Sequence, residues 1–267
     1  MIKIGILIHE NEYRFVRCSY LINHLIRLWA KEDFAIIIIK GIKPKPEVDI
    51  LINHIDLTII PPEYQEYMDR HPKVINGKIR DISKRHISNH LLESRTTYEG
   101  PVIVKPNLNA GGLAEIAKSI PDGLVKLRDQ LINQQKNITY SIFNSLSDVP
   151  EMIFSNDEFI VEKFLPEVED DVYYLRVCSF LGDKYVCSRV GSKEPIVKGA
   201  SVISRELLEP PAEILAYIKE RKFDYGKFDF CIHQGEVILF DTNKTPGDSP
   251  YNEDNAKILA GGIRAFL

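Results

Sequence analysis

The sequence predicts a mixed fold, with a parallel α/β lobe at the start of the chain followed by α+β lobes with antiparallel strands. Two observations support this prediction. Residues 3–53 alternate short apolar strands with one helix, and after Gly100-Pro101 the pattern changes to strand pairs joined by short turns. The chain has 267 residues, which is enough for one large domain or for two to three small lobes with a real core.

The first part of the chain has the order strand, helix, strand, which at this spacing indicates a parallel βαβ start. Its helix is indicated by apolar residues at helical intervals, among them Leu21, Leu25 and Trp29. Prolines at positions 44, 46, 61 and 62 interrupt the pattern. In chain order, the predicted elements are a strand at 3–8, a helix at 17–31, strands at 34–39 and 49–53, and helices at 63–70 and 82–94.

The second part of the chain is predicted to contain antiparallel strand pairs. Gly182-Asp183 supplies a turn between two strands, and a later strand pair turns at Gly235. In chain order, the predicted elements are a strand at 102–105, a helix at 123–133, strands at 158–164, 173–180 and 184–190, a helix at 210–221 and a hairpin at 227–243.

The composition argues against several classes of protein. The formal net charge of −4 gives no electrostatic case for nucleic acid or a membrane surface as partner. The apolar run at 35–39 is far too short to span a bilayer, and no signal peptide opens the chain. The four cysteines, at positions 18, 178, 187 and 231, form no CxxC pair, so we expect reduced thiols in a cytoplasmic protein.

The hairpin at 227–243 is the most informative segment, because polar side chains interrupt strands that are otherwise apolar. Asp229 lies on its first strand, and Asp241 and Asn243 end its second strand. Side chains alternate along a strand, so Asp241 and Asn243 share a face. Two carboxylates and a carboxamide are hard oxygen ligands of the kind that suits Mg²⁺. These three residues are therefore the predicted metal ligands.

Whether Asp229 joins this face depends on the length of the hairpin loop. A two-residue turn, Gln234-Gly235, would pair Asp229 with Phe240 and direct Asp241 to the other face. A three-residue loop that includes His233 would place Asp229 and Asp241 on one face, with Gly235 in the left-handed third position. We expect the three-residue loop.

Four segments together resemble the ATP-grasp superfamily of carboxylate–amine ligases. They are Pro101–Lys105, Val161–Glu167, Tyr174–Arg176 and the end of the hairpin, Asp241–Gly247. The resemblance covers about residues 79–247. It implies an ATP-grasp fold of three lobes: a parallel α/β lobe at 1–78 that precedes the grasp, a small lobe at 79–158, and a large lobe at 159–267 that clamps ATP against the small one.

The resemblance also implies ATP-binding residues. Lys84 and Lys105 would bind phosphate oxygens, and the loop at 107–112 would close over the triphosphate. Residues 162–165 would form the hinge that reads adenine, and Glu167 or Glu169 would bind the ribose, with the spacing in favour of Glu169. The nucleotide-binding residues implied in this way are Lys84, Lys105, Asn107, Asn109, Gly111, Gly112, Glu162, Lys163, Phe164, Leu165 and Glu169. Asp241 stands where the family usually has Glu.

Catalytic residues implied by the resemblance are Arg176, Arg189 and Lys198. The two arginines lie on strands expected to face the site, where a guanidinium suits phosphate or carboxylate oxygens. Either arginine could instead close a structural ion pair. Lys193 and Lys198 lie in a loop near the expected acceptor, and a solvated loop is the alternative.

The implied activity is ATP- and Mg²⁺-dependent joining of a carboxylate to an amine through an acylphosphate, with Mn²⁺ as a possible replacement for Mg²⁺. The partners are small carboxylate and amine substrates such as amino acids or peptides, and a homodimer is possible. The alternatives are a small-molecule kinase and a nucleotide-binding module without turnover. Loops after the first and third strands, with His9 and His54, could contact the acceptor, although packed or surface histidines are favoured.

Overall fold

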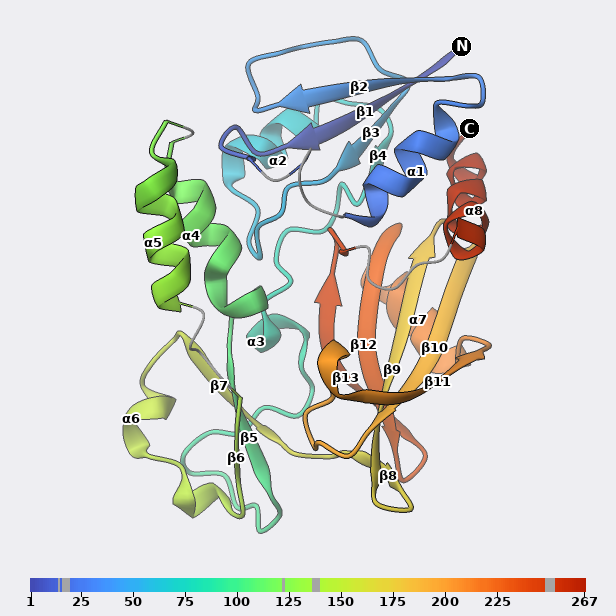
Figure 1. Ribbon diagram of the computed structural model, residues 1–267. Helices are drawn as coiled ribbons and strands as arrows, with labels where there is room; N and C mark the ends of the chain where they lie inside the picture. Colours follow the sequence, from blue (N-terminus) through green and yellow to red (C-terminus); the bar gives the residue numbers. More distant parts are fainter. Residues whose placement is uncertain (14, 16–19, 122, 136–139, 248–252) are drawn as a thin grey trace.

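The computed structural model describes residues 1–13, 15, 20–121, 123–135, 140–247 and 253–267 (Figure 1). The described chain forms three sheets of four, three and six strands. In Figure 1 the four-stranded sheet lies at the top, the three-stranded sheet at the lower left and the six-stranded sheet at the lower right. The mixed α/β and α+β fold expected from the sequence is confirmed.

The first lobe contains the parallel sheet, with strand order β2-β1-β3-β4. Apolar runs form its central strands, and every residue of β3 is buried. The elements are β1 (Ile2–Ile8), α1 (Leu21–Trp29), β2 (Phe34–Lys40), β3 (Ile50–Asn53), α2 (Pro62–Met68) and β4 (Val74–Ile75). Residues 17–19 of the helix predicted at 17–31 lie outside the described part of the chain.

The small lobe contains the three-stranded antiparallel sheet, in the order β6-β5-β7. Its strands are β5 (Val102–Pro106), β6 (Ser141–Phe143) and β7 (Phe159–Lys163). Its helices are α3 (Lys84–Ile87), η1 (Asn109–Gly112), α4 (Leu113–Ser119), α5 (Val125–Gln135), η2 (Leu146–Asp148) and α6 (Glu151–Phe154). Because β7 pairs with β5, the strand that begins at 159 shares a sheet with the small lobe.

The helix predicted at 82–94 is wrong beyond its first turn. Only α3 is helical, and the chain then runs beside β7. The Leu92 amide donates to the Val161 carbonyl at 2.8 Å, and the Lys163 amide donates to the His90 carbonyl at 3.1 Å. Tertiary pairing with a strand edge thus overrides a helical apolar pattern in this segment.

The large lobe is built on the antiparallel sheet β11-β10-β9-β12-β13, with β8 added at one end of β9. Its strands are β8 (Glu167–Glu169), β9 (Val172–Leu181), β10 (Lys184–Ser192), β11 (Val202–Leu208), β12 (Tyr225–His233) and β13 (Glu236–Asn243). Its helices are η3 (Gly199–Ser201), α7 (Ala212–Glu220), α8 (Glu253–Gly261) and η4 (Gly262–Phe266).

The two faces of the large sheet have different roles. Helix α7 lies behind the sheet in Figure 1, and its Ile214 and Ile218 pack in one core with Phe180, Phe228 and Phe230. Burying each such side chain contributes about 1.5–3 kcal/mol. The opposite face is directed toward the other two lobes. The first-lobe core continues onto the end of this face through α8, and the Trp29 indole donates to the Ala260 carbonyl at 2.9 Å.

The hairpin β12–β13 has a two-residue turn, so the expectation of a three-residue loop is wrong. His233 pairs with Glu236, and the turn residues Gln234 and Gly235 both have positive φ, 50° and 86°. The register then shifts at Phe240, so that Phe230 pairs with Leu239 but Asp229 pairs with Asp241. A β-bulge therefore restores the shared face that the tight turn alone would have removed.

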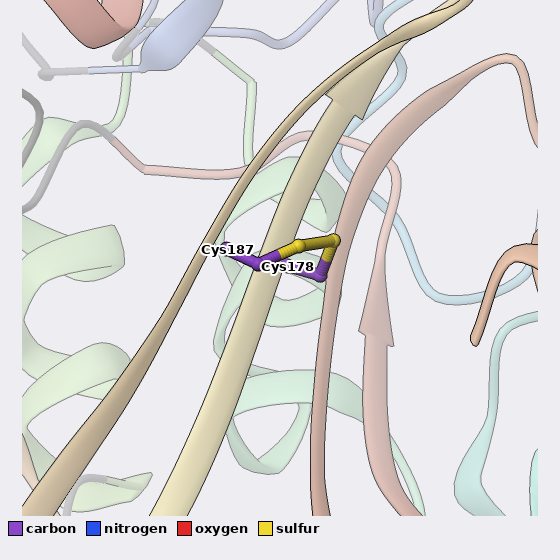
Figure 2. The surroundings of a disulfide bond; sticks show 2 residues. All are labelled: Cys178 and Cys187. Carbon is purple, nitrogen blue, oxygen red and sulfur yellow. A yellow bond between two sulfur atoms is a disulfide. The ribbon is translucent and has the colours of Figure 1, made fainter. Parts of the chain in front are cut away.

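Cysteines 178 and 187 are joined in a disulfide, so the expectation of reduced thiols is wrong for this pair (Figure 2). The short turn between β9 and β10 places Cys178 directly opposite Cys187, and both side chains are buried under α7. Cys231 is a buried free thiol, whereas Cys18 lies outside the described residues.

None of the helices in the described ranges combines the length and the apolar character required to cross a bilayer.

Candidate active site

A cleft lies between the small sheet and the front face of the large sheet. Six residues expected at the nucleotide site line it: Lys105, Glu162, Lys163, Phe164, Asp229 and Asp241. They come from four different strands or strand ends, β5, β7, β12 and β13. The remaining lining residues are mostly apolar or aromatic: Ile103, Tyr140, Pro166, Tyr173, Tyr174, Leu175, Pro195, Ile196, Val197 and Phe240. An apolar cleft with a few convergent polar groups is the usual form of a small-molecule site.

Asp229 and Asp241 lie directly opposite each other on neighbouring strands, which places their carboxylates on one face. The Oδ1 atom of each is buried without a hydrogen-bond partner in the described chain, and so is Glu162 Oε1 in the same cleft. Asp229 Oδ2 accepts a hydrogen bond from Lys227 at 3.0 Å. The pKa of Asp229 is raised mainly by burial and also by the nearby charge of Asp241, while the ammonium groups of Lys227 and Lys84 oppose this rise.

Two buried lysines face these carboxylates. Lys84 is 2% exposed, and its Nζ lies 3.4 Å from Asp241 Oδ1 and 3.3 Å from Asn109 Oδ1. Lys105 is 5% exposed and forms an ion pair with Glu162. Lysines are almost never this buried without paired charges. The carboxylates of Asp241 and Glu162 supply these partners, and the binding of phosphate by the two lysines stays a prediction.

The loop at 107–112 folds into the short helix η1 and is held from two sides. The Asn109 amide donates to Thr58 Oγ1 at 3.0 Å, and its side-chain Nδ2 donates to the Thr242 carbonyl at 2.9 Å. Gly111 and Gly112 have φ values of 65° and 76°, a conformation that strongly favours glycine. Asn107 has a different role, because its Oδ1 accepts the Arg85 amide at 3.0 Å and its carbonyl accepts the Lys84 amide at 3.0 Å.

Asn243 shares the face of Asp241 but is engaged with its own neighbour. Its Oδ1 accepts the Thr245 amide at 2.8 Å and lies 3.2 Å from Thr245 Oγ1. Within the described residues, no group of three or more His, Cys, Asp or Glu side chains forms a metal site. Protein ligation here therefore rests on two carboxylates and a carboxamide, and a cation would need further oxygens from a ligand.

The donors nevertheless fit a divalent cation of the Mg²⁺ type. The Oδ1 atoms of Asp229 and Asp241, which have no hydrogen-bond partner in the described chain, are hard ligands, and the repulsion between the two carboxylates is relieved by positive charge. Unit charges about 4 Å apart at an effective dielectric of about 20 interact by about 4 kcal/mol.

Residues 162–165, at the end of β7, lie between the two sheets along one wall of the cleft. The Lys163 and Phe164 amides are used within the protein, donating to the His90 carbonyl at 3.1 Å and the Pro101 carbonyl at 2.8 Å. The Leu165 carbonyl accepts the Cys231 thiol at 3.1 Å.

Arg176 and Arg189 do not face the cleft, contrary to expectation. Strand register places them opposite each other in a row with Phe230 and Leu239, on the face covered by α7. The reason is alternation: Asp229 pairs with Val177, so the next residue on β9 points to the other side.

Both arginines instead bind the buried carboxylate of Glu167. Arg176 donates to its two oxygens at 2.9 and 2.8 Å, and Arg189 Nε donates at 2.8 Å. Burial alone would raise the pKa of Glu167, but these hydrogen bonds and charges lower it. Glu169, expected at the ribose, is exposed and forms an ion pair with Arg189 at 2.8 Å on this same back side. The alternative of structural ion pairs is thus what the structure shows.

The loop before β11 reaches the cleft with apolar residues. Ile196 and Val197 line it, while the neighbouring Lys198 is exposed to solvent. Lys193 is also exposed, and its Nζ donates to the Asp170 carbonyl at 3.4 Å.

Among the residues close to the charged groups of the site, Lys227, Phe240 and Tyr140 were not predicted from the sequence. Lys227 stands two residues before Asp229 on β12, and the alternation of strand side chains could have revealed it. Phe240 lines the cleft because of the bulge, and Tyr140 precedes β6 in a segment without a sequence signal. Burial raises the pKa of Tyr140, and the charges of Asp241, Asp229 and Glu162 raise it further.

The two histidines of the first lobe that were considered as acceptor contacts, His9 and His54, both pack against aromatic rings. His54 is 1% exposed and packs edge-on against the rings of Phe15 and Tyr20. Burial lowers the pKa of His54 to about 3, so it is a neutral packed side chain. His9 stacks on Tyr64, and burial lowers its pKa as well.

No family model matches the chain, and no curated protein matches it in sequence. Solved structures do match over nearly its whole length. D-alanine–D-alanine ligase from Bacillus anthracis, complexed with ATP, matches with a TM-score of 0.52 and 16% identity, covering 100% of this chain and 95% of that chain. The ATP-grasp RimK domain protein from Sphaerobacter thermophilus matches with a TM-score of 0.52 and 10% identity, covering 98% and 99%.

A third match is the RiPP-associated ATP-grasp ligase from Chryseobacterium gregarium, in complex with ADP and with a leader and core peptide. Its TM-score is 0.52 at 10% identity, with coverage of 99% of this chain and 96% of that chain. The chain therefore has the ATP-grasp fold.

Proposed function

We propose that this protein is an ATP- and Mg²⁺-dependent ligase that activates a carboxylate as an acylphosphate and joins it to an amine. One observation carries the proposal. Three carboxylates, those of Asp229, Asp241 and Glu162, line one cleft between two sheets, each with one oxygen that has no hydrogen-bond partner in the described chain. The amines of Lys227, Lys84 and Lys105 pair with them. Such a concentration of charged groups in a mostly apolar cleft is typical of a functional site, because removing charges from water is costly even when they are paired.

The cleft residues divide the nucleotide between them in this proposal. Lys84 and Lys105 bind phosphate oxygens, and the apolar side chains of Ile103, Val197 and Phe240 enclose the base. The Leu165 amide, which has no acceptor in the described part of the chain, is available to hydrogen-bond the base. When bound through Asp229, Asp241 and Asn243, Mg²⁺ would neutralise charge on the phosphates during transfer.

The reaction then requires positioning more than acid–base chemistry. A substrate carboxylate oxygen attacks the γ-phosphorus, the bond from this phosphorus to the bridging oxygen breaks, and ADP leaves. An amine next attacks the acyl carbon, phosphate departs and the amine proton passes to solvent. No nucleophilic side chain of the protein is needed, since Lys84, Lys105 and Lys227 supply charge stabilisation around the cleft.

The structural neighbours support this class of reaction and of substrate. The matched chains include ligases, and one of them was solved with ADP and peptides. We therefore propose amino acids or peptides as the carboxylate and amine substrates. The carboxyl edge of the parallel sheet, where ligands usually bind in such folds, borders the end of β13 through the bridge between Tyr20 and Gly247.

The test is ADP release from Mg·ATP with a panel of amino acids and peptides, with and without hydroxylamine. Hydroxamate formation that depends on a carboxylate substrate is the expected result. A stable phosphoester would instead show a kinase, and ATP binding without ADP release would show a module without turnover. Asp157→Asn, at a fully exposed carboxylate, serves as the matched control for variants of Asp241.

A further inference from the structure

Residues 56–58 of the first lobe contact both halves of the proposed nucleotide site. Thr58 binds the phosphate-loop side: its Oγ1 accepts the Asn109 amide at 3.0 Å, and its own amide donates to Glu115 Oε1 at 2.6 Å. Leu57 binds the metal-hairpin side, because its carbonyl accepts the buried Lys244 ammonium. This segment therefore joins the phosphate loop to the end of β13.

Asp56 is the centre of this junction. Its Oδ1 accepts the Thr245 hydroxyl at 2.8 Å. Its Oδ2 accepts the Tyr20 hydroxyl at 2.8 Å and the Lys118 ammonium at 3.2 Å. Lys118 lies on α4, directly after the phosphate loop, and also pairs with Glu12 at 3.0 Å. One carboxylate thus receives groups from the first lobe, the small lobe and the large lobe.

The Thr245 hydroxyl has a single proton and two possible acceptors. Asp56 Oδ1 lies 2.8 Å away and Asn243 Oδ1 lies 3.2 Å away. A carboxylate is the stronger acceptor, and here it is also the closer one, so the proton belongs to Asp56. Asn243 Oδ1 then accepts only the Thr245 amide, at 2.8 Å, and keeps its second lone pair.

We propose that Asp56 is a positioning residue for the metal ligand Asn243: by holding the Thr245 proton, it leaves one lone pair of Asn243 Oδ1 free to bind a divalent cation. The proposal rests on the proposed function, because it concerns the cation that accompanies ATP. Without the Asp56 carboxylate, the Thr245 hydroxyl would donate to Asn243 Oδ1 and compete with the cation. The substitution Thr245→Val would remove the competing hydroxyl.

The test measures ADP affinity by calorimetry in Mg²⁺ and in EDTA. The measured quantity is the dissociation constant in EDTA divided by the dissociation constant in Mg²⁺. This ratio isolates the metal-dependent part of ADP binding from any change in the loop at 107–112. Asp56→Ala should lower this ratio about fivefold, the equivalent of one hydrogen bond of about 1 kcal/mol. Thr245→Val should leave the ratio within about twofold of wild type, and the double variant Asp56→Ala/Thr245→Val should restore it.

Further variants separate this mechanism from a general loss of structure. Asp56→Ala/Thr245→Ser keeps a hydroxyl at 245 and should keep the low ratio. Asp56→Asn, with a weaker neutral acceptor, should give an intermediate ratio if the alanine variant fails to fold. Thr97→Val and Asp157→Ala, at exposed positions, are the matched controls.

Two results would overturn the inference: a ratio lowered by Thr245→Val as much as by Asp56→Ala, or a double variant that stays as low as Asp56→Ala. Both leave the proposed function standing, provided the wild-type protein binds ADP more tightly in Mg²⁺ than in EDTA. A wild-type ratio of one would instead reject the metal site itself, and with it the proposed function.

Discussion

At the scale of single residues, the opposed carboxylates of Asp229 and Asp241 are the sharpest test of the site. Asp241→Asn keeps the size of the side chain and an oxygen near Lys84, but removes a charged ligand. Because a bound cation contributes several kcal/mol of charge stabilisation, Mg²⁺-dependent ADP release should fall at least about a hundredfold. The measurement is a coupled assay of ADP release over a Mg²⁺ series, and turnover near the wild-type rate would place Asp241 outside the site.

Arg176 offers the opposite kind of test, because the structure turns it away from the cleft. Arg176→Gln removes two of the hydrogen bonds to the buried Glu167 carboxylate, so the free energy of unfolding should fall by about 2 kcal/mol. The affinity for Mg·ADP should stay unchanged. Urea denaturation and calorimetry measure the two quantities, with the exposed Arg95→Gln as control. Loss of affinity without loss of stability would return Arg176 to the site.

His54 predicts a pH dependence of stability. Its pKa is lowered from 6.5 to about 3 in the folded protein, so between these values the unfolded chain takes up a proton that the folded chain refuses. The stability contributed by neutral His54 is complete above pH 6.5 and falls as the pH is lowered. At pH 5 the linkage cost is about 2 kcal/mol.

His54→Phe keeps a ring against Phe15 and Tyr20 and removes this linkage. The unfolding free energy of the variant, relative to wild type, should therefore rise by about 2 kcal/mol between pH 7.5 and pH 5, measured by urea denaturation. Equal pH dependence in both proteins would mean that His54 titrates in the folded state.

At the scale of elements, apolar runs bounded by turns were strong signals, and segments shaped by tertiary contacts were not. The strands predicted at 3–8, 34–39 and 184–190 agree with β1, β2 and β10 to within two residues at each end. β11 was missed because five of its seven residues are exposed and give no apolar pattern. The segment after α3 was misjudged because a strand partner distant in sequence, β7, fixes its conformation.

The candidate site shows the same division. Asp229 and Asp241 share a face, as predicted, but not because of a three-residue loop. Their pairing comes from a bulge at Phe240, which the preferences of turn residues do not reveal. The faces of Arg176 and Arg189 depend on the register of β9 against β12, which no single strand contains. Alternation predicts which residues of one strand share a face. Which residues of two different strands share a face depends on the register between the strands, which only the folded structure gives.

The turn of the β12–β13 hairpin gives a prediction for one element. Gln234 has a φ of 50°, in a turn where both central residues have positive φ. Asparagine tolerates this conformation better than glutamine, so Gln234→Asn should raise the free energy of unfolding by about 0.5 kcal/mol. Gln234→Val, with a β-branched side chain, should lower it. Thermal denaturation of the three proteins checks the order, and a valine variant as stable as the asparagine variant would contradict it.

At the scale of the whole molecule, the three lobes meet around the loop at 107–112. The loop and the helix α4 that follows it are anchored to the first lobe through Thr58, Asp56 and Glu12, and to β13 through Thr242. A nucleotide bound in the cleft would add contacts to the face of the loop at 107–112 that these hydrogen bonds and ion pairs do not cover. Opening of this loop should therefore become incompatible with bound Mg·ADP.

Hydrogen exchange measures that opening directly. If amides of Asn109–Gly112 exchange only when the loop leaves the nucleotide, Mg·ADP at about 100 times its dissociation constant should stabilise the closed form by about 2.7 kcal/mol. Exchange in a peptide covering residues 107–113 should then slow about a hundredfold, while exchange in β2, at the far edge of the first sheet, should not change. EDTA should cancel most of the effect if the cation holds the nucleotide in place. Equal exchange with and without Mg·ADP would show that the segment is not the lid, or that its existing bonds to Thr58 and Thr242 already keep it closed.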